Sequence, residues 1–313
     1  MKLSERQLIA LSLILVLIAS LLVVLSFTVH LPAPAVGEGY VALIEIEGVV
    51  SYASSPLSLF GSTARVDDII ELIDEALKDE YAKALVLCVN SPGGSAAASE
   101  ALYLKVREFA HSKPVVVFIR EFGTSGAYMA SLPARKIVAA NSSIVGSIGV
   151  YMMVVTYAGL LEKLGVKVYV FKSGELKDLG SPFRSLTETE KRVYEEMVRE
   201  IFSLFKERVL MHRGEKLSDL DEVFSGRTFT ATRALQLGLI DEIGTLDDAV
   251  RVARELAGLP DTAPVRRLSP PKPGLLQILL GELKSSRMLS PSYEILAMWP
   301  PPVTTSLPVS QGP

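Results

Sequence analysis

The sequence has one cysteine and three histidines among 313 residues, and it contains no run of basic residues. A single cysteine excludes a disulfide within the chain. Cys88 lies in the apolar run Ala84–Val89, which is typical of a buried strand, so we expect a core residue rather than a nucleophile. The net charge of −3 and the lack of a basic run argue against nucleic acid as a partner.

Charge is also absent from Leu8–Val29, a stretch of 22 residues. At ~1.5 Å per residue this stretch makes roughly 33 Å of helix, enough to cross a bilayer core of about 30 Å. Lys2 and Arg6 precede it and no Lys or Arg occurs in His30–Gly39, which predicts a cytoplasmic N-terminus and an exported main domain. A cleaved secretory signal is the alternative, because Ala33–Ala35 resembles a cleavage site, but the apolar run is longer than a signal core.

Strand and helix patterns alternate after residue 40, which predicts a layered α/β fold with mostly parallel strands. The expected strands cover residues 40–50, 83–89, 115–119, 136–140, 149–155 and 167–172. The expected helices cover residues 66–78, 95–110, a short segment after Ser125, 157–164 and 187–211.

These patterns divide the chain into five segments. Residues 1–6 form a cytoplasmic N-terminus, 7–29 a transmembrane anchor, 30–39 a linker, 40–260 one globular domain and 261–313 a Pro-rich tail. Within the tail, residues 275–289 are amphipathic and predict one helix for a membrane surface or a subunit contact.

Two residues suggest nucleophilic chemistry. Ser125 lies between Gly123 and Gly126 at the start of the predicted short helix, where small neighbours admit a carbonyl group and the helix N-terminus favours negative charge. Lys177 follows 52 residues later in a Gly-rich loop. If the two side chains meet and the lysine is neutral, the amine would accept the serine proton. Taken singly, each also fits an ordinary role, the serine as a helix cap and the lysine as a solvated side chain.

A histidine base is the other way to activate a serine. His30 lies at the predicted membrane edge, His111 at a predicted helix end, and His212 in Met-His-Arg-Gly. None of the three lies in a Gly-rich or motif-like context, so a Ser-His-Asp triad has no support in the sequence.

A further candidate is the segment Asn90–Gly94, which ends one predicted strand and precedes a helix. Consecutive glycines let backbone N–H groups converge at a helix N-terminus, which is how an oxyanion is held during acyl transfer. The alternative is an ordinary strand-to-helix turn with Pro92 at the first helical position.

Together these segments resemble the membrane-anchored signal peptide peptidases of the SppA type, which are serine–lysine proteases of the ClpP/crotonase fold. The resemblance covers roughly residues 40–255 and departs from the family pattern at Ala127 and Ala231, where glycine is usual. Five motifs in order carry it: Asn-Ser-Pro-Gly-Gly at 90–94, Phe-Gly-Thr-Ser-Gly-Ala-Tyr at 122–128, Gly-Ser-Ile-Gly-Val at 146–150, Lys-Ser-Gly-Glu-Leu-Lys-Asp-Leu-Gly-Ser-Pro-Phe-Arg at 172–184, and the segment 224–244.

The resemblance implies that Ser125 is the nucleophile, that Lys177 is the general base and that Ser147 orients the lysine. It also implies a membrane-anchored endopeptidase that cleaves hydrophobic peptides such as released signal peptides, with no metal and no cofactor. Short members of the family form rings, with an octamer suggested, and build the site between neighbouring subunits. Whether Ser125 and Lys177 act within one chain or across two stays open here. The oxyanion donors that the resemblance implies are Gly93, Gly94 and Gly126.

Three other functions are compatible with the fold. A related serine–lysine protease would act on the termini of membrane proteins. A crotonase-type acyl-CoA enzyme would share the oxyanion site, but the export signal argues against it because CoA is cytoplasmic. A catalytically silent membrane scaffold would require Ser125 or Lys177 to be misplaced.

Overall fold

The computed structural model describes residues 12–20, 39–52, 63–270 and 296–298. Residues 12–20 are helical and belong to a different compact unit from residues 39–313. Within these described ranges, no helix has both the length and the apolar character needed to cross a membrane. The rest of the predicted span 7–29 lies outside the described residues, and so does the predicted tail helix at 275–289.

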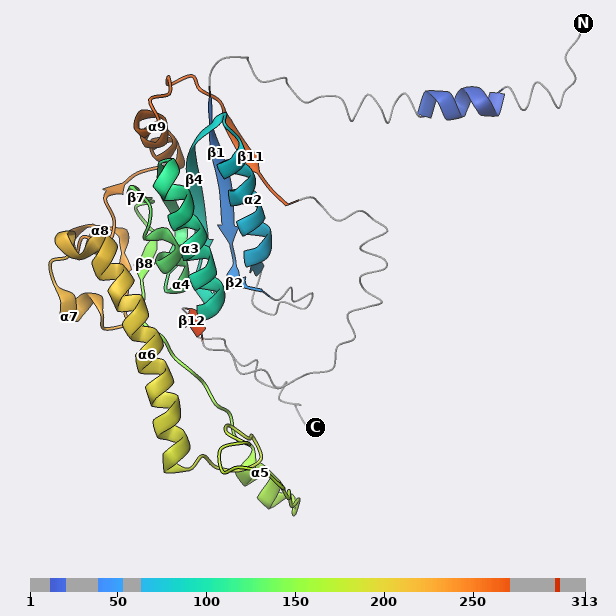
Figure 1. The fold of residues 1–313 in the computed structure, drawn as a ribbon, viewed down its shortest axis with the longest axis vertical. Helices are drawn as coiled ribbons and strands as arrows, with labels where there is room; N and C mark the ends of the chain where they lie inside the picture. The colour runs from blue at the N-terminus through green and yellow to red at the C-terminus, as the bar shows by residue number, and fades with distance from the viewer. Residues whose placement is uncertain (1–11, 21–38, 53–62, 271–295, 299–313) are drawn as a thin grey trace, which may run out of the picture. The chain divides into compact units, whose positions relative to one another are not determined.

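A mostly parallel sheet forms the centre of residues 39–313 (Figure 1). Its strands are β1 (Tyr40–Glu47), β4 (Ala82–Ser91), β6 (Val115–Thr124), β7 (Lys136–Ala139), β8 (Ile144–Gly146), β9 (Thr228–Thr230), β10 (Glu242–Ile243) and β11 (Val265–Leu268). Neighbours along the order β10-β7-β6-β4-β1-β11 all pair in parallel. β8 pairs in parallel with the end of β6, and only its pairing with β9 is antiparallel among the described strands of this sheet. The predicted α/β class is therefore confirmed.

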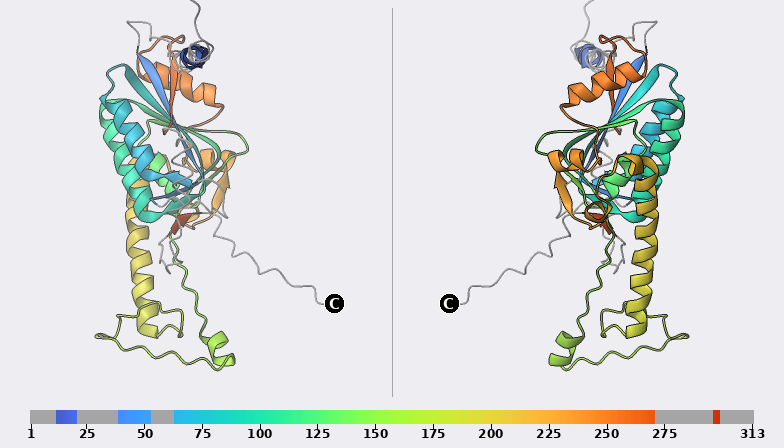
Figure 2. Two further views of the ribbon diagram at one scale, coloured as in Figure 1. Left: turned by 90° about the vertical axis from the view of Figure 1, so that its right-hand side faces the viewer. Right: turned by 90° about the vertical axis from the view of Figure 1, so that its left-hand side faces the viewer.

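Helices cover both faces of this sheet (Figure 2). The helices of this unit include α2 (Val66–Lys78), α3 (Ala96–Ser112), α4 (Gly126–Ser131), α6 (Glu188–Arg213), α7 (Leu220–Val223), α8 (Ala231–Gln236) and α9 (Leu246–Leu256), with a short 3-10 helix at Gly214–Lys216. One core joins α2 and α3 to the sheet and a second joins α9 to its other face. Because both faces are covered, β4 is buried throughout residues 84–89, and Cys88 is a buried core residue as predicted.

A small second sheet lies beside the C-terminal ends of the central strands. It contains β2 (Val49–Ser51), β3 (Thr63–Arg65), β5 (Gly93–Ser95) and β12 (Leu296–Met298), in the order β12-β5-β2-β3. The single strand predicted for residues 40–50 is wrong, because Gly48 has a φ of 88° and breaks it into β1 and β2. The chain thus changes sheets at Gly48.

Residues 150–187, which we call the arm, leave the central sheet after β8 and return at α6 (Figure 1). The arm contains the helix α5 (Ala158–Lys163), as predicted, but the strands predicted at 149–155 and 167–172 are wrong. Their β-branched and aromatic residues have the composition of strands. In the part of the chain that the structure describes they form no ladder, and Tyr151 makes a single isolated bridge.

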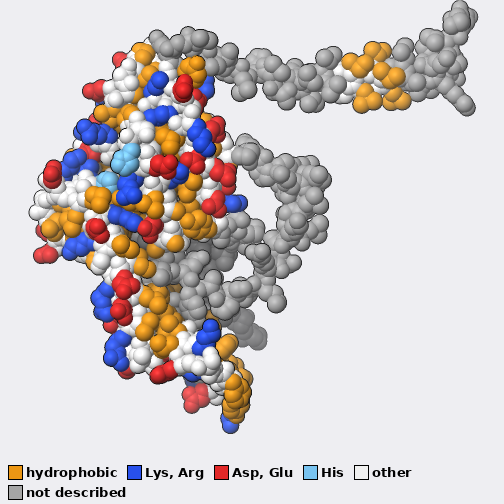
Figure 3. All heavy atoms as spheres, viewed as in Figure 1, with side chains coloured by type: hydrophobic (Ala, Val, Ile, Leu, Met, Phe, Trp, Pro, Cys, Tyr) orange, Lys and Arg blue, Asp and Glu red, His pale blue; other side chains and the backbone are white. Residues whose placement is uncertain are grey.

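Apolar side chains of the arm are unusually exposed. The side chain of Phe171 is 96% exposed and that of Tyr169 is 75% exposed. Figure 3 shows hydrophobic side chains gathered over the projection that the arm and α6 form. An exposed apolar surface of this kind marks a site of contact with another molecule.

Candidate active site

Ser125 occupies a strained turn between β6 and α4. Its φ is 53° and its ψ is −122°, a conformation that a residue with a side chain adopts at a cost of about 1–3 kcal/mol. Among the described residues, Ser125 and Ser147 are the two non-glycine positions with positive φ. Strain of this kind persists where surrounding contacts hold the backbone in place, and strained residues are frequent at functional sites.

Two hydrogen bonds hold these strained serines. The Ser125 N–H donates to the Gly146 carbonyl at 2.7 Å, and the Ser147 N–H donates to the Arg227 carbonyl at 2.9 Å. β8 positions both serines, because its pairing with β6 sets Gly146 opposite Thr124. Gly146 has a φ of 94°, and a Cβ there would lie 2.6 Å from the ring of Phe229, so only glycine fits.

The Ser125 side chain is buried at the base of the arm. It is 1% exposed, and its hydroxyl donates to the Gly149 carbonyl at 3.5 Å, a long hydrogen bond. Ser147 is 7% exposed, and within the described residues its hydroxyl has no hydrogen-bond partner. The two serines predicted from different motifs therefore lie in one small region beside β8.

The predicted oxyanion turn lies in the same region. β4 and β6 pair Ser91 with Gly123, and β5 contacts α4. A Cβ at Gly94 would lie 2.0 Å from the Val50 carbonyl oxygen, so the close approach of β2 and β5 requires glycine. The N–H of Gly93 donates to the Ser91 hydroxyl at 3.1 Å, which favours Gly94 over Gly93 as an oxyanion donor. Gly126 begins α4, where the backbone N–H groups have no partner inside the helix.

The outer edge of β5 carries an extended segment of the same chain. β12 pairs antiparallel with β5, setting Ala297 opposite Gly94 and Met298 opposite Gly93, and it also contacts α3 and α4. This edge of β5 therefore accepts an extended peptide beside the candidate oxyanion turn. Sequence patterns did not predict β12, because residues 296–298 form too short a segment to show strand periodicity.

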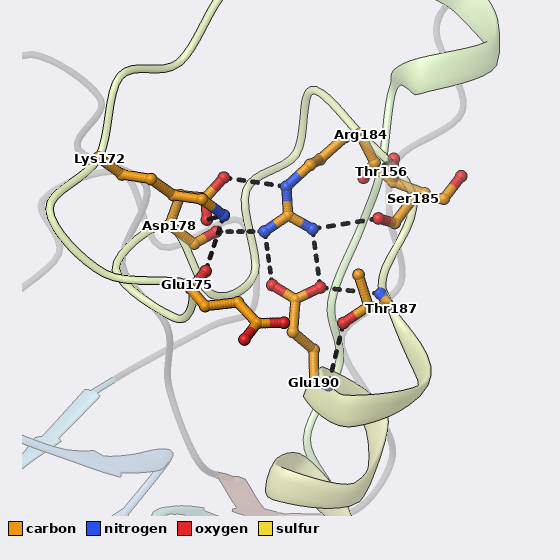
Figure 4. Close-up of polar contacts among 8 residues, drawn as sticks. All are labelled: Thr156, Lys172, Glu175, Asp178, Arg184, Ser185, Thr187 and Glu190. Carbon is orange, nitrogen blue, oxygen red and sulfur yellow. Dashed lines mark hydrogen bonds and ion pairs between the residues drawn. The ribbon is translucent and has the colours of Figure 1, made fainter.

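Lys177 lies in the arm, in a turn where its N–H donates to the Gly174 carbonyl at 3.1 Å, and its side chain is exposed. Its neighbour Asp178 is bound to Arg184, which in turn binds Glu190 in the first turn of α6 (Figure 4). The loop that contains Lys177 is thus fastened to the N-terminal end of α6.

The other end of α6 reaches the helix that follows Ser125. Arg208 Nη1 lies 3.5 Å from the sulfur of Met129 in α4. Glu190 precedes Arg208 by 18 residues, which corresponds to roughly 27 Å along a helix axis. The structure therefore does not bring Lys177 and Ser125 together within one chain.

Four charged side chains form the connection between the Lys177 loop and α6, and we call them the Arg184 network: Lys172, Asp178, Arg184 and Glu190. The hydrogen bonds from Arg184 and Lys172 hold the pKa of Asp178 well below its usual range. Those from Arg184 and Thr187 lower the pKa of Glu190 to about 2. Both carboxylates of the network are therefore ionised at neutral pH. Sequence patterns did not predict this network, although Thr187 and Glu190 have the spacing of a capping box, which the structure contains.

None of the described histidines is hydrogen-bonded to Ser125. His212 Nε2 lies 3.0 Å from the hydroxyl of Tyr103, and burial lowers the pKa of His212. His111 lies in the last turn of α3, and His30 falls outside the described residues. In the described ranges, no three His, Cys, Asp or Glu side chains gather into a group that would hold a metal ion.

The sequence is similar to a peptidase family and to several proteases. The sequence profile of peptidase family S49 matches residues 107–260. A candidate protease of Methanocaldococcus jannaschii is 44% identical over 61% of this chain and 61% of its own length. The chloroplast serine protease SPPA of Arabidopsis thaliana is 32% identical over 78% of this chain, which spans 37% of that protein. A candidate protease of Synechocystis is 31% identical over 68% of this chain and 78% of its own length. The chain belongs to peptidase family S49.

Proposed function

We propose that this protein is a membrane-anchored serine endopeptidase in which Ser125 is the nucleophile and Lys177 the general base. Its substrates are hydrophobic peptides, such as released signal peptides. The observation that carries the proposal is the strained pair of serines, Ser125 and Ser147, beside a glycine turn in a chain of peptidase family S49. The fold assignment that goes with it is the ClpP/crotonase type, whose layered α/β sheet matches the class found here.

The proposed reaction is acyl transfer through a covalent intermediate. Neutral Lys177 takes the proton from Ser125 Oγ, which attacks the carbonyl carbon of the scissile bond. The N–H of Gly94, with that of Gly93 or Gly126, holds the oxyanion. Lys177 then protonates the leaving amine and activates the water that releases the acyl group, while the Ser147 hydroxyl orients the amine.

We assign Ser125 and Lys177 of one site to neighbouring subunits. The separation of roughly 27 Å along α6 supports this assignment. So do the exposed apolar residues of the arm, which would contact the next subunit of a ring. An exposed lysine is also a poor base, and burial against a neighbouring subunit would favour its neutral form.

We place the protein in the membrane through residues 7–29, with the N-terminus in the cytoplasm and the catalytic domain outside. The uncharged run and the Lys and Arg residues that precede it support this topology. Such an anchor would keep the site close to hydrophobic peptides that leave the bilayer.

Labelling by a serine-reactive phosphonate tests the proposed chemistry. We expect an adduct on the tryptic peptide Glu121–Arg135, assigned by fragmentation to Ser125 rather than Ser131. The Ser131 hydroxyl donates to the Ala127 carbonyl at 2.8 Å, whereas the Ser125 hydroxyl makes a long hydrogen bond of 3.5 Å. The Lys177→Ala protein should label much more slowly, since no base would activate the serine. An acyl-CoA enzyme of the crotonase type would give no adduct, and that result would reject the proposal.

The position of β12 predicts that the tail competes with substrate. A peptide substrate pairing with β5 would have to displace residues 296–298, so deletion of residues 271–313 should lower KM by roughly threefold to tenfold, because a tethered competitor acts at high effective concentration. Deletion of residues 299–313 alone keeps β12 and is the matched control. Equal KM values for the two truncated proteins would contradict the prediction.

A further inference from the structure

The Arg184 network joins the arm to the first turn of α6 around one guanidinium group (Figure 4). Arg184 donates from Nη1 and Nη2 to the two carboxylate oxygens of Glu190, at 2.7 Å and 2.5 Å. It also donates from Nε to Asp178 Oδ2 at 2.9 Å and from Nη2 to the Asp178 carbonyl at 3.1 Å. Lys172 donates to Asp178 Oδ1 at 2.6 Å. A bidentate guanidinium–carboxylate pair of this kind fixes orientation as well as distance.

Burial sets this network apart from an ordinary surface ion pair. The Glu190 side chain is 2% exposed and that of Asp178 is 13% exposed, although both belong to a part of the chain rich in exposed residues. Glu190 also accepts a hydrogen bond from the N–H of Thr187, the residue that caps the N-terminus of α6. Lys172 and Arg184 thus close the loop at 172–184 on Asp178, and Arg184 fastens it to the first turn of a long helix.

Lys177 lies inside this fastened loop and takes no part in the network. In the part of the chain that the structure describes, no hydrogen bond or ion pair involves its Nζ atom. The next residue, Asp178, carries a carboxylate that could pair with the amine, but both of its oxygens accept hydrogen bonds from Arg184 and Lys172. The amine is therefore exposed and free while the adjacent carboxylate is occupied.

This arrangement matters because a general base must be unprotonated. A free carboxylate beside an amine favours the ammonium form, which cannot accept a proton. A carboxylate that is already paired with two cations favours the ammonium form of a nearby amine much less. The two cations and two anions of the Arg184 network together have no net charge.

We propose that Arg184 is a positioning residue for Lys177, an inference that rests on the proposed function. Arg184 holds the lysine loop against the end of α6, so that the amine projects towards the Ser125 of a neighbouring subunit. It also keeps the Asp178 carboxylate occupied, so that this carboxylate does not bind the Lys177 amine.

The variant Arg184→Gln tests both roles. We expect kcat to fall roughly 10²-fold, because small displacements of a catalytic group have effects of this size, with KM nearly unchanged because β5 is untouched. The acid limb of the pH–rate profile, where the rate falls as Lys177 becomes protonated, should move to higher pH. The reason is that an unpaired Asp178 carboxylate would favour the protonated form of the Lys177 amine. Besides Lys177, the charged groups on this loop, on the first two turns of α6 and on the segment beside Phe183 are Glu162, Lys167, Lys172, Glu175, Asp178, Arg184, Glu188, Glu190, Lys191 and Arg192.

A double variant separates the two roles. In Asp178→Asn/Arg184→Gln the acid limb should return to its position in the unmodified protein while kcat stays low, because the competing carboxylate is gone but the loop is still loose. If Arg184→Gln does not fold, Arg184→Lys keeps the charge without the bidentate geometry and should show smaller changes in the same directions. The control is Lys191→Gln, which removes an exposed ion pair with Glu188 on the same helix turn and should leave both kcat and the acid limb unchanged.

The outcomes distinguish this inference from the proposed function. Activity that survives Lys177→Ala would reject the proposed function itself. An inactive Lys177→Ala protein together with an Arg184→Gln protein of unchanged kcat and acid limb would reject the positioning role alone. A loss of kcat without any movement of the acid limb would reject the role of Arg184 in occupying Asp178.

Discussion

Replacement of Ser125 by alanine is expected to lower kcat/KM for a hydrophobic peptide by about 10⁴-fold or more, because the covalent route is lost and the remaining donors act alone. Lys177→Ala should lower it by at least roughly 10²-fold, the usual contribution of a general base. Hydrolysis of a quenched fluorescent peptide measures both. Ser142→Ala and Lys167→Ala are matched controls, since both side chains are exposed, and they should keep nearly full activity.

The strained backbone of Ser125 adds a second readout to this prediction. Glycine adopts a φ of 53° without the cost that a side chain imposes, so Ser125→Gly should unfold at a higher temperature than the Ser125→Ala protein. The expected difference in free energy of unfolding is about 1 kcal/mol. An active Ser125→Ala protein would remove Ser125 from the proposed mechanism, whereas equal stability of the two variants would mean that the turn stores no strain.

Local signals in the sequence predicted the elements that depend on local contacts. The apolar spacing of residues 66–78 predicts α2 with the bounds observed, and the small residues around Ser125 predict the turn before α4. The continuous apolar run of β4 predicts a strand buried on both faces, which α2, α3 and α9 provide. These features follow from the order of residues along one short segment.

Features that depend on distant partners were not predictable in the same way. Residues 149–155 and 167–172 have the composition of strands, but a strand also needs a neighbour to form a ladder, and neither segment forms one with the described residues. The Arg184 network joins residues whose roles become visible only when the loop folds onto α6. The spacing between Ser125 and Lys177 likewise left open how far apart they lie, because α6 separates them in space.

The second large effect is the recovery of activity when two inactive proteins are mixed. If each site takes Ser125 from one subunit and Lys177 from the next, the Lys177→Ala protein supplies intact serines and the Ser125→Ala protein supplies intact lysines. In a ring assembled at random from equal amounts, about one quarter of the sites would contain both groups, since each site joins one pair of neighbours. The mixture should therefore regain about a quarter of the normal activity, far above either variant alone.

The measurement needs assemblies that contain both variants and a control that lacks every intact serine. Both proteins are co-expressed with different tags and purified through both tags, so that every assembly contains the two variants. The control carries Ser125→Ala and Lys177→Ala on the same chain, mixed with Ser125→Ala, and should stay inactive because that pair lacks every intact serine.

Hydrolysis of the fluorescent peptide by the co-purified Ser125→Ala and Lys177→Ala assembly is the most direct test of a site shared between chains. The separation of Lys177 from Ser125 along α6 predicts activity near one quarter of that of the unmodified protein. An assembly that contains both variants and stays as inactive as each alone would contradict the shared site and would require the arm to fold back onto its own Ser125.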